Sequence, residues 1–493
     1  TEDEFLSQLK TAKSEALNAF GSDEIILERA VINPRHIEIQ VFADRHGNCI
    51  YLGERDCSVQ RRHQKVVEEA PSPFVSEALR KEMGTAAVNA AKACDYVGAG
   101  TVEFLTDDDG KFYFLEMNTR LQVEHPVTEL VTDVDLVAWQ LTIAAGGLLP
   151  KTQEEVTITG HAMEVRLYAE DPALGFMPQT GKVLRWDYSE GIGMRMDAGI
   201  RQGQTITPFY DPMLAKVIAY GENRDVARRR LMASLKKLNL LGVRSNRGFL
   251  YNILNNEVFA SGGATTGFIE KDFNEDKTLT PHPLTEKQQA IAAWLFYLKG
   301  AAKYTNDNER TFWRNSNPAP TWIDLAYLDD AHSVGVNVVD AQKNQFNVAV
   351  ADQVFDFSLL ELNDQQLVYI ESGVKSTFNF AFDNDETVFL ESHEGCIQVD
   401  NTTHAPAVSA ESAGNGQIKA SMDGGIMDVL VEVGAQVEKG DTLVILEAMK
   451  MEHAMKADTS GVIKTVQVSK GDQVKGRQLL IEIEVPEAEL ESA

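Results

Sequence analysis

The chain has 493 residues, of which 43% are hydrophobic and 24% charged, a composition typical of globular proteins long enough for several domains. Its formal net charge of −28 argues against a nucleic-acid partner and against an anionic membrane surface. No apolar run approaches the length of a transmembrane helix. The four cysteines lack the spacing of metal ligands and indicate reduced thiols in an intracellular compartment.

The chain begins with a predicted helix and two predicted strands. Residues 1–20 have helical spacing, and residues 25–27 and 33–41 have the apolar content or alternation of strands. Because side chains alternate across a strand, the second of these strands gathers polar residues on one face, which is usually the solvent side. These polar residues are His36, Glu38 and Gln40.

A cationic cluster follows at residues 54–65, with the sequence E-R-D-C-S-V-Q-R-R-H-Q-K. It concentrates positive charge in an otherwise acidic protein, which suits phosphate or carboxylate oxygens. Alone, such a cluster is more typical of a solvated loop, so its interpretation depends on the stretches that follow.

Opposite charges occur in a predicted hairpin, whose strands are residues 101–105 and 112–116 with Gly110 in the turn between them. The strands carry Glu103 and Glu116, and Asn118 follows two residues later. Two carboxylates and an amide oxygen are suitable ligands for Mg²⁺. Next, alternate positions hold Arg120, Gln122 and Glu124, a pattern that predicts convergence on a small anion.

Together these stretches resemble the biotin carboxylase family, a branch of the ATP-grasp ligases. The matching sequences are N-P-R-H-I-E-I-Q, E-R-D-C-S-V-Q-R-R-H-Q-K, G-A-G-T-V-E-F and E-M-N-T-R-L-Q-V-E-H-P-V-T-E, beginning at residues 33, 54, 98 and 116. The match continues to about residue 270 through residues 193–197, 210–213 and 220–224. A match of this length predicts an ATP-grasp fold for residues 31–275.

The resemblance implies roles for individual residues. The ATP-binding residues would be Glu28, His36, Gln60, His63, Glu103 and Glu116. Glu103, Glu116 and Asn118 would hold Mg²⁺ or Mn²⁺. Bicarbonate would bind Lys65, Arg120, Gln122, Val123 and Glu124, with Lys65 and Arg120 also catalytic. Glu124 would deprotonate bicarbonate for attack on the γ-phosphate, and Arg195 would stabilise the enolate of biotin.

One expectation concerns the start of the chain. Members of the family carry an upstream domain and a Gly-rich loop that closes over ATP, whereas this sequence begins at Thr1 and is not Gly-rich before Glu28. We therefore expect residues 1–30 to be the remnant of an ATP-grasp lid domain. We also expect residues 1–493 alone to bind ATP weakly and to be inactive in turnover.

The middle of the chain, residues 276–402, contains a helix-like run from Glu286 to Tyr297 and many short alternating segments. This pattern predicts a helix with an antiparallel β-barrel and shows no catalytic cluster. By position it resembles the domain that joins biotin subunits to a carboxyltransferase. Residues 403–417 are small and polar and predict a flexible linker, with a root-mean-square span of ~20 Å and an extended reach of ~50 Å.

Residues 418–486 contain a repeated pattern that predicts a flattened β-barrel, followed by a tail at residues 487–493. The first copy is Gly424, Ile426, Val429, Val431, Gly434, Val437, Gly440 and Leu443, and the second is Gly461, Ile463, Val466, Val468, Gly471, Val474, Gly476 and Leu479. Lys450 lies between the copies in E-A-M-K-M-E-H, which resembles the attachment site of a biotinyl carrier domain. Lipoyl domains share this barrel, but a Met on each side of the lysine favours covalent biotin.

The whole chain thus resembles a multidomain α+β ligase, the biotin-containing subunit of an acyl-CoA carboxylase. The resemblance implies ATP- and bicarbonate-dependent carboxylation of biotin, a biotin protein ligase that modifies Lys450, and a hetero-oligomer with a carboxyltransferase β subunit that binds the acyl-CoA. We expect neither a nucleic-acid partner nor a membrane. The expected location is the bacterial cytoplasm, or the mitochondrial matrix in a eukaryote.

The acyl-CoA substrate is less sharply indicated. The residues after Lys450, Met451-Glu452-His453, look most like 3-methylcrotonyl-CoA carboxylase α subunits of leucine catabolism. Geranyl-, propionyl- and acetyl-CoA carboxylases stay open, and pyruvate carboxylase is disfavoured because a long transferase insertion is absent. Two alternatives from other classes are a non-catalytic biotin carrier and assembly subunit, which the intact charged motifs oppose, and a lipoyl-type carrier.

Overall fold

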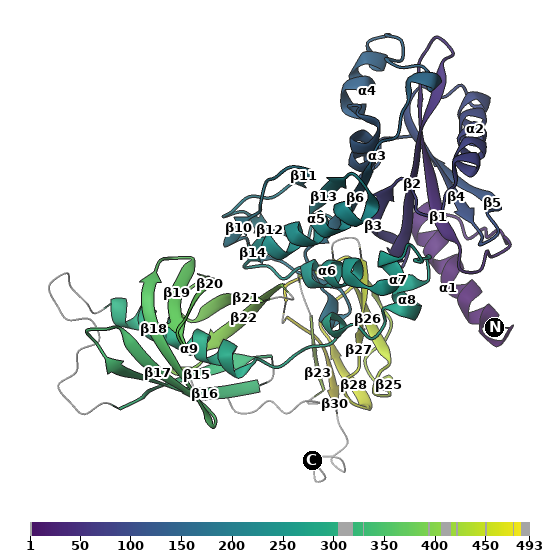
Figure 1. Ribbon diagram of the computed structural model, residues 1–493. Helices are drawn as coiled ribbons and strands as arrows, with labels where there is room; N and C mark the ends of the chain where they lie inside the picture. The colour runs from purple at the N-terminus through teal and green to yellow at the C-terminus, as the bar shows by residue number, and fades with distance from the viewer. Residues whose placement is uncertain are drawn as a thin grey trace.

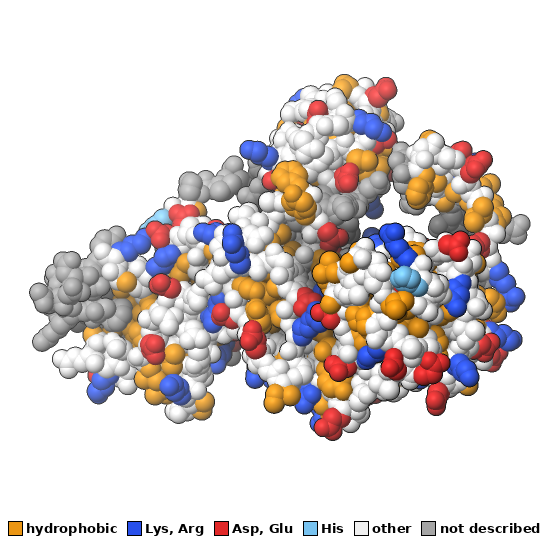
Figure 2. Space-filling view, turned by 90° about the horizontal axis from the view of Figure 1, so that it is seen from above, with side chains coloured by type: hydrophobic (Ala, Val, Ile, Leu, Met, Phe, Trp, Pro, Cys, Tyr) orange, Lys and Arg blue, Asp and Glu red, His pale blue; other side chains and the backbone are white. Residues whose placement is uncertain are grey.

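The computed structural model describes residues 2–303, 319–328, 330–392, 395–405, 416–420, 423–448, 451–476 and 478–484. Figure 1 shows three bodies: an N-terminal body of sheet and helices, a barrel with one helix, and a small C-terminal β-sandwich. Acidic and basic side chains are interspersed on the face seen in Figure 2. Within the described residues, no helix is both long enough and apolar enough to cross a membrane.

The N-terminal body is built on an antiparallel eight-stranded sheet with the order β11-β13-β6-β3-β2-β1-β4-β5. Its strands are β1 (Arg35–Ala43), β2 (Cys49–Arg61), β3 (Gln64–Ala70), β4 (Gly98–Thr106), β5 (Phe112–Asn118), β6 (His161–Tyr168), β11 (Met194–Ala198) and β13 (Met213–Gly221). The predicted hairpin is confirmed as β4 and β5, although β5 extends two residues further, through Asn118.

Helices cover both faces of this sheet. On one face lie α2 (Glu77–Ala93) and α5 (Arg224–Lys237), and on the other lie α3 (His125–Thr132) and α4 (Leu136–Ala144). Ile37, Ile39 and Val41 of β1 therefore pack against α2. The polar face of β1 is buried as well, because it points toward the layer of α3 and α4 rather than toward solvent.

The remaining short elements close the edges of this body. They are the helices α6 (Arg247–Asn255), α7 (Glu257–Ala260), α8 (Phe268–Asp272) and the 3₁₀ turns η1 (Gln153–Glu155), η2 (Pro172–Leu174) and η3 (Lys277–Leu279). Three small strand pairs are β7 (Glu170–Asp171) with β8 (Met177–Pro178), β9 (Gly181–Lys182) with β12 (Thr205–Ile206), and β10 (Arg185–Asp187) with β14 (Asn239–Leu241).

The N-terminal segment confirms one prediction and overturns another. The predicted helix is α1 (Glu2–Phe20), but the strand predicted at residues 25–27 is wrong. Ile26 and Leu27 are 81% and 79% exposed, and no described strand pairs with them. Strand propensity alone does not form a strand, because the backbone needs a neighbouring strand for its hydrogen bonds.

Arg55 is the buried hub of the N-terminal body. Its guanidinium has no solvent exposure and donates hydrogen bonds to side chains of two other strands, of α3 and of the segment before α3. The acceptors are Glu38 (2.5 Å), Gln40 (2.7 Å), Thr101 (3.2 Å), Gln122 (3.0 Å) and Thr128 (3.0 Å). The planar fork of arginine suits this arrangement, and a lysine ammonium would not reach all these acceptors.

The second body confirms the predicted helix and antiparallel barrel. Helix α9 (Glu286–Ala302) begins with a capping box of Thr285 and Gln288 and inserts Trp294 into the barrel core. The barrel closes through β15–β22 pairing. Its strands are β15 (Thr321–Tyr327), β16 (Asp330–Asp340), β17 (Gln345–Val350), β18 (Gln353–Leu362), β19 (Gln366–Glu371), β20 (Val374–Phe382), β21 (Thr387–Ser392) and β22 (Gly395–Asn401).

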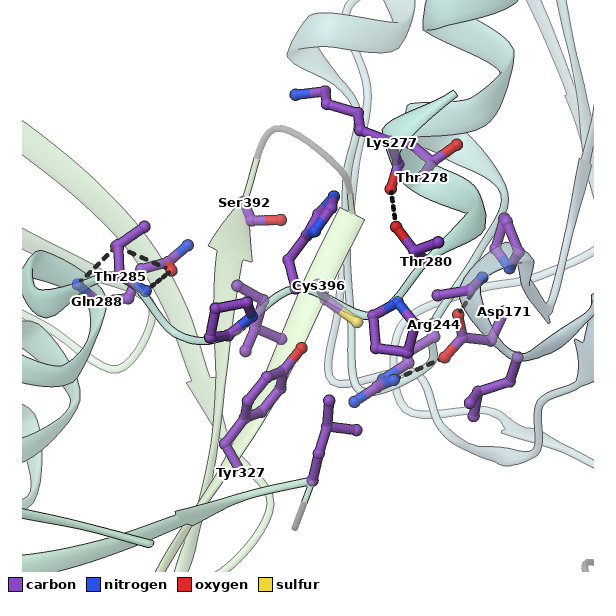
Figure 3. A pocket seen from close by; sticks show the side chains of 18 of the residues that line it. Asp171, Arg244, Lys277, Thr278, Thr280, Thr285, Gln288, Tyr327, Ser392 and Cys396 are labelled. Carbon is purple, nitrogen blue, oxygen red and sulfur yellow. Dashed lines mark hydrogen bonds and ion pairs between the residues drawn. The ribbon is translucent and has the colours of Figure 1, made fainter. Parts of the chain in front are cut away.

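Arginines join the barrel to the N-terminal body. Arg185 donates to the Gln365 carbonyl (2.7 Å) and to Asn379 (2.9 Å), and Arg247 donates to the Ser392 carbonyl. Beside this junction lies a cavity of about 430 Å³, where Asp171, Arg244, Tyr327 and Cys396 meet (Figure 3). Arg244 pairs with Asp171 at 2.6 Å, and the buried Cys396 thiol donates to the Val243 carbonyl.

The third body is the C-terminal sandwich, in which two four-stranded sheets follow the repeat seen in the sequence. One sheet has the order β23-β30-β28-β25 and the other β27-β26-β24-β29. The strands are β23 (Gln417–Lys419), β24 (Gly424–Val429), β25 (Gln436–Val437), β26 (Thr442–Ala448), β27 (Met451–Lys456), β28 (Gly461–Val466), β29 (Gln473–Val474) and β30 (Leu479–Glu484).

The two halves of this sandwich exchange their short strands, because β25 pairs with β28 and β29 pairs with β24. Gly434 and Gly471 occupy equivalent turns with φ of +89° and +93°, values that favour glycine. In the hairpin, strand β26 ends at Ala448 and strand β27 begins at Met451. Lys450 itself, and residues 406–415 of the predicted linker, lie outside the described residues.

Replacing Trp294 with alanine should destabilise the barrel. The Trp294 side chain is fully buried and contacts Phe357, Phe346 and Tyr369, with ring centroids 4.8, 5.3 and 5.9 Å away. We expect W294A to lower the free energy of unfolding by about 3–5 kcal/mol in urea denaturation. The matched control is W322A, whose side chain is 55% exposed and whose loss should cost less than about 0.5 kcal/mol.

Replacing Arg55 with methionine should leave the buried Glu38 carboxylate without its guanidinium partner. We expect R55M to lower the stability of the N-terminal body by about 3–5 kcal/mol, measured by the midpoint of its thermal or urea transition. R229M is the control, because the Arg229 side chain is 66% exposed in its pair with Asp225. Equal stabilities of the two variants would contradict the role of Arg55 as a hub.

Candidate active site

A cavity of about 690 Å³ lies in the N-terminal body. Its wall comes from β1, the hairpin of β2 and β3, the ends of β4 and β5, and the segment before α3. Most of the residues predicted from the sequence to act in binding or catalysis line it. They are His36, Gln60, His63, Lys65, Glu103, Glu116, Asn118, Arg120, Gln122, Val123 and Glu124.

Strand register brings the charged side chains into one row. Arg55 of β2 lies opposite Glu38 of β1, Glu38 lies opposite Glu103 of β4, and Glu103 lies opposite Glu116 of β5. Directly opposed residues of antiparallel strands point to the same face. Because a slip of one residue would turn a strand's side chains to the other face, the register decides whether this row exists.

Lys65 is the central cation of the cavity. Its ammonium contacts Glu38 (2.5 Å), Glu124 (2.7 Å) and Glu103 (3.1 Å). Burial alone lowers the pKa of Lys65, but these carboxylates outweigh burial and raise that pKa well above its usual value. Lys65 therefore stays charged at any physiological pH.

The carboxylates of the row are correspondingly held ionised. Burial alone raises the pKa of Glu38, but Arg55 and then Lys65 outweigh it and bring that pKa to about 2. Burial likewise raises the pKa of Glu103, and its bonds with His36 and Lys65 lower that pKa to about 2. The site is thus a set of ion pairs that persists at neutral pH.

His36 and Gln60 form a second layer beside Glu103. The His36 Nε2 lies 2.7 Å from a Glu103 oxygen, and the Gln60 amide nitrogen lies 2.6 Å from His36 Nδ1. Since the amide donates, Nδ1 accepts, and this assigns the ring proton to Nε2, facing Glu103. His63, with φ of +66°, is exposed in the turn between β2 and β3 and lines the cavity.

Glu28 is placed differently from the other predicted residues. It is exposed and does not line the cavity, whereas the adjoining Arg29, Ala30 and Val31 do. The segment after Glu28 therefore reaches the cavity, while the Glu28 side chain lies outside the group that the structure brings together.

Glu103, Glu116 and Asn118 meet at the mouth of the cavity. The Asn118 amide nitrogen donates to Glu103 at 2.9 Å and to Glu116 at 3.0 Å. The amide thus stands between two carboxylates where a divalent cation would be attracted, and rotating it by half a turn presents its oxygen instead. This oxygen-only donor set fits Mg²⁺ or Mn²⁺.

Glu124 is held between two cations. It precedes α3 and is 1% exposed, with one oxygen 2.7 Å from Lys65 and the other 3.0 Å from Arg166. Gln122 accepts from Arg55 and donates to Glu103 at 2.7 Å. The Val123 carbonyl accepts from Lys216 at 2.9 Å, and the exposed Arg120 reaches Asn118 at 3.4 Å.

Arg166 is the residue that the sequence analysis missed. It lies on β6 and lines the cavity beside Glu124. Its only sequence signal is one basic residue in the alternating strand H-A-M-E-V-R-L-Y, which resembles an ordinary polar strand position. Arg195, by contrast, is not in the cavity wall, and its guanidinium pairs with Asp197 (2.8 Å) and Glu129 (2.9 Å).

This geometry supports a particular chemistry. A buried carboxylate flanked by cations can take a proton from a bound anion, and the flanking cations can hold that anion and the charge that develops on it. The neighbouring oxygen ligands can hold a metal ion against phosphate groups. The cavity therefore suits the activation of a small anion by a nucleotide.

Models of three protein families match the chain. Residues 1–152 match the ATP-binding domain of the carbamoyl-phosphate synthase L chain, residues 164–271 the biotin carboxylase C-terminal domain, and residues 416–483 the family described as biotin-requiring enzyme. These matches cover the N-terminal body and the C-terminal sandwich.

Curated relatives extend over nearly the whole chain. The chain is 39% identical over 503 residues to the mitochondrial methylcrotonoyl-CoA carboxylase subunit alpha of Rattus norvegicus, covering 99% of this chain and 70% of that protein. It is 36% identical over 506 residues to the propionyl-CoA carboxylase alpha chain of Ruegeria pomeroyi, covering 96% and 73%. A biotin carboxylase of Halalkalibacterium halodurans is 55% identical over 254 residues, covering 52% and 56%.

Solved structures of biotin carboxylases share the fold. The biotin carboxylase domain of Hydrogenobacter thermophilus 2-oxoglutarate carboxylase, in complex with MgADP and bicarbonate, is 42% identical with a TM-score of 0.55. It covers 57% of this chain, and the chain spans 62% of its length. The Campylobacter jejuni biotin carboxylase is 38% identical with a TM-score of 0.53, covering 55% of this chain and 60% of that structure.

The order of the bodies, the ATP-binding and biotin-dependent domains, and identity over nearly the full chain all agree. The chain belongs to the family of biotin-dependent acyl-CoA carboxylase α subunits, which are ATP-dependent ligases with biotin as their cofactor.

Proposed function

We propose that this protein carboxylates biotin on Lys450 with ATP and bicarbonate, and that a separate carboxyltransferase β subunit then transfers the carboxyl group to 3-methylcrotonyl-CoA. The observation that carries the proposal is Glu124, a buried carboxylate held between Lys65 and Arg166 beside a site for a divalent cation.

In this proposal Glu124 removes the proton of bicarbonate. Bicarbonate is a poor electrophile and becomes reactive when its oxygen attacks the γ-phosphate of ATP and displaces ADP, giving carboxyphosphate. Lys65 contacts Glu124, and Arg120 and Gln122 line the same cavity, so these three residues would hold the anion during this step. Positive charge beside the base favours the dianion that attacks, since the developing charge is stabilised as it forms.

Glu103, Glu116 and Asn118 would hold the metal ion that accompanies ATP, because the two carboxylates flank the Asn118 amide, whose oxygen would replace its nitrogen after a half-turn. His36 and Gln60 would fix Glu103 from behind, and His63 would face the nucleotide. Glu28 has no role in this reaction, because its side chain is exposed and does not line the cavity.

Biotin, when bound, supplies the ureido nitrogen that accepts the carboxyl group. We propose that Arg166 provides the positive charge facing this group, because it lines the cavity and touches the base. Arg195 would act instead on Glu129 of α3, with which its guanidinium pairs at 2.9 Å. This proposal moves the role first expected of Arg195 to Arg166.

The C-terminal sandwich would carry biotin on Lys450 after modification by a biotin protein ligase, and residues 403–417 would let it travel between two active sites. The barrel body would dock the β subunit, giving a hetero-oligomer. The choice of 3-methylcrotonyl-CoA rests on the relatives named methylcrotonoyl-CoA carboxylase, including those of rat and of Dictyostelium discoideum, at 39% and 36% identity. Propionyl-CoA is the second candidate, from the Ruegeria relative at 36%.

The proposal is tested on the native complex captured on monomeric avidin. Fixation of labelled bicarbonate is measured against 3-methylcrotonyl-, propionyl-, acetyl- and geranyl-CoA, with and without ATP. We expect capture, ATP dependence, and labelling of 3-methylcrotonyl-CoA. Labelling of propionyl-CoA instead would move the protein to the second candidate, and capture without labelling of any acyl-CoA would refute the proposed reaction.

Replacing Glu124 with glutamine removes the base while keeping the shape of the side chain. We expect E124Q in the same complex to lower bicarbonate-dependent ATP hydrolysis and biotin carboxylation by about 10²–10⁴-fold, the usual contribution of a positioned general base. The control is E82Q, because Glu82 is exposed on α2, remote from the cavity. Activity of E124Q within a few-fold of the wild type would exclude Glu124 as the base.

A further inference from the structure

Two buried carboxyl groups behind the cavity have no part in the proposed reaction. Glu68 of β3 and Glu164 of β6 are both without solvent exposure. Both oxygens of Glu164 and one oxygen of Glu68 have no hydrogen-bond partner among the described residues. Unpartnered buried carboxylates are costly, so this pair requires a physical explanation.

The strand register places these two groups together. Glu68 lies directly opposite Glu164 in the antiparallel β3–β6 pair. Opposed residues in such a pair have Cβ atoms roughly 4.5–5.5 Å apart, within reach of two glutamate side chains. The same face carries Ala162 and Ile218, which pack with Val127 of α3, so one side of Glu164 is apolar.

Arg166 connects the pair to the reaction site. Its Nε donates to Glu68 at 2.6 Å and its Nη2 contacts Glu124 at 3.0 Å. The Arg166 guanidinium therefore contacts Glu68 of the carboxyl pair on one side and Glu124, the proposed base, on the other. Polar contacts thus link Glu68 through Arg166 to Glu124, and Glu164 lies opposite Glu68 in the strand register.

The positive charges near Glu68 and Glu164 are too few to stabilise both side chains as ionised carboxylates. The charged or titratable groups that face the pair are Arg166 and Tyr168 on β6, Lys65 on β3, Lys216 on β13, Cys57 on β2 and Glu124 before α3. Lys65 is already engaged by Glu38, Glu103 and Glu124, and Lys216 by Asp197 at 3.3 Å. Burial first, and then the mutual repulsion of the two groups, keep the pKa of Glu164 well above its usual value.

We propose that Glu68 and Glu164 share one proton during turnover and together act as positioning residues that present a fully charged Arg166 to Glu124 and the bound anion. The shared proton keeps the charge of the pair at that of one carboxylate. A second ionised group would change the summed charge of Arg166 and the pair from zero to −1 and would repel both Glu124 and bicarbonate. The kinetic part of this inference rests on the proposed function, but the proton itself does not.

The shared proton is tested by infrared spectroscopy on the full biotinylated chain with carbon-13-labelled glutamate. At pH 7.5 the wild type should show the carbonyl stretch of a protonated carboxyl group, and that component should be missing from E164Q. The matched control is E170Q, because Glu170 is also buried with a pKa raised to about 7 by burial, but it lies on β7 and has Arg61 nearby. Identical wild-type and E164Q spectra would overturn the proposal.

The stability of the protein provides a second readout with a definite sign. Burial and then the neighbouring Glu68 raise the pKa of Glu164 well above its usual value, so the stability that its protonated form contributes is present at low pH and is lost as the pH rises through that raised pKa. Glutamine at position 164 cannot ionise and relieves this loss. We expect the melting temperature of E164Q to exceed that of the wild type by about 2–4 °C at pH 8 and to match it at pH 6. A melting temperature that is lowered equally at both pH values would indicate a merely structural side chain.

The kinetic consequence is measured separately in the native complex. In the wild type, kcat/KM for bicarbonate should fall on the alkaline side as the pair loses its shared proton, and in E164Q this fall should shift to higher pH. E170Q should retain the wild-type profile. An unchanged profile in E164Q would overturn the positioning role, whereas a complex that fixes no bicarbonate at all would refute the proposed function and leave the spectroscopic result standing.

Discussion

The structure depends on the pairing of buried charges in the row that crosses β2, β1, β4 and β5. Arg55 and Glu38 are both without solvent exposure, and a lone charge at such depth is costly. Each is tolerated because its partners come from other strands, so the row forms only when the register is correct. Buried ion pairs add little net stability. They do fix the relative positions of the paired side chains, because few arrangements satisfy all partners at once. Here the geometry positions Lys65 and Glu124.

The barrel and the C-terminal sandwich are stabilised in different ways from the N-terminal body. The barrel is closed, which removes exposed sheet edges, and α9 fills its interior with Trp294. It is joined to the N-terminal body by Arg185 and Arg247, which donate to backbone carbonyls, and Arg185 also donates to the Asn379 side chain. The sandwich has its own apolar core around Leu443, Leu446 and Leu480. Because the sandwich has a core of its own, its stability does not require contact with the rest of the chain.

Charge balance explains why the reaction site extends beyond its lining residues. Lys65 is shared by Glu38, Glu103 and Glu124, and Arg166 is shared by Glu124 and Glu68. Each additional ionised carboxylate reduces the net positive charge of Lys65 and Arg166 that can attract an anion in the cavity. The buried pair behind Arg166 therefore belongs to the same electrostatic system as Glu124, the proposed base, although neither member of the pair lines the cavity.

The sequence by itself determined the family, the antiparallel barrel, the repeat of the sandwich and most of the cavity lining, because those residues occur in contiguous motifs. It did not determine the burial of His36 and Glu38, since an alternating polar face is the same pattern whether helices or water cover it. The strand expected at residues 25–27 failed for lack of a paired neighbour. Only the tertiary structure decided that Arg166, which is 42 residues from Glu124, meets it while Arg195 does not line the cavity. The reason is that strand register and helix packing, rather than local spacing, decide which distant charges become neighbours.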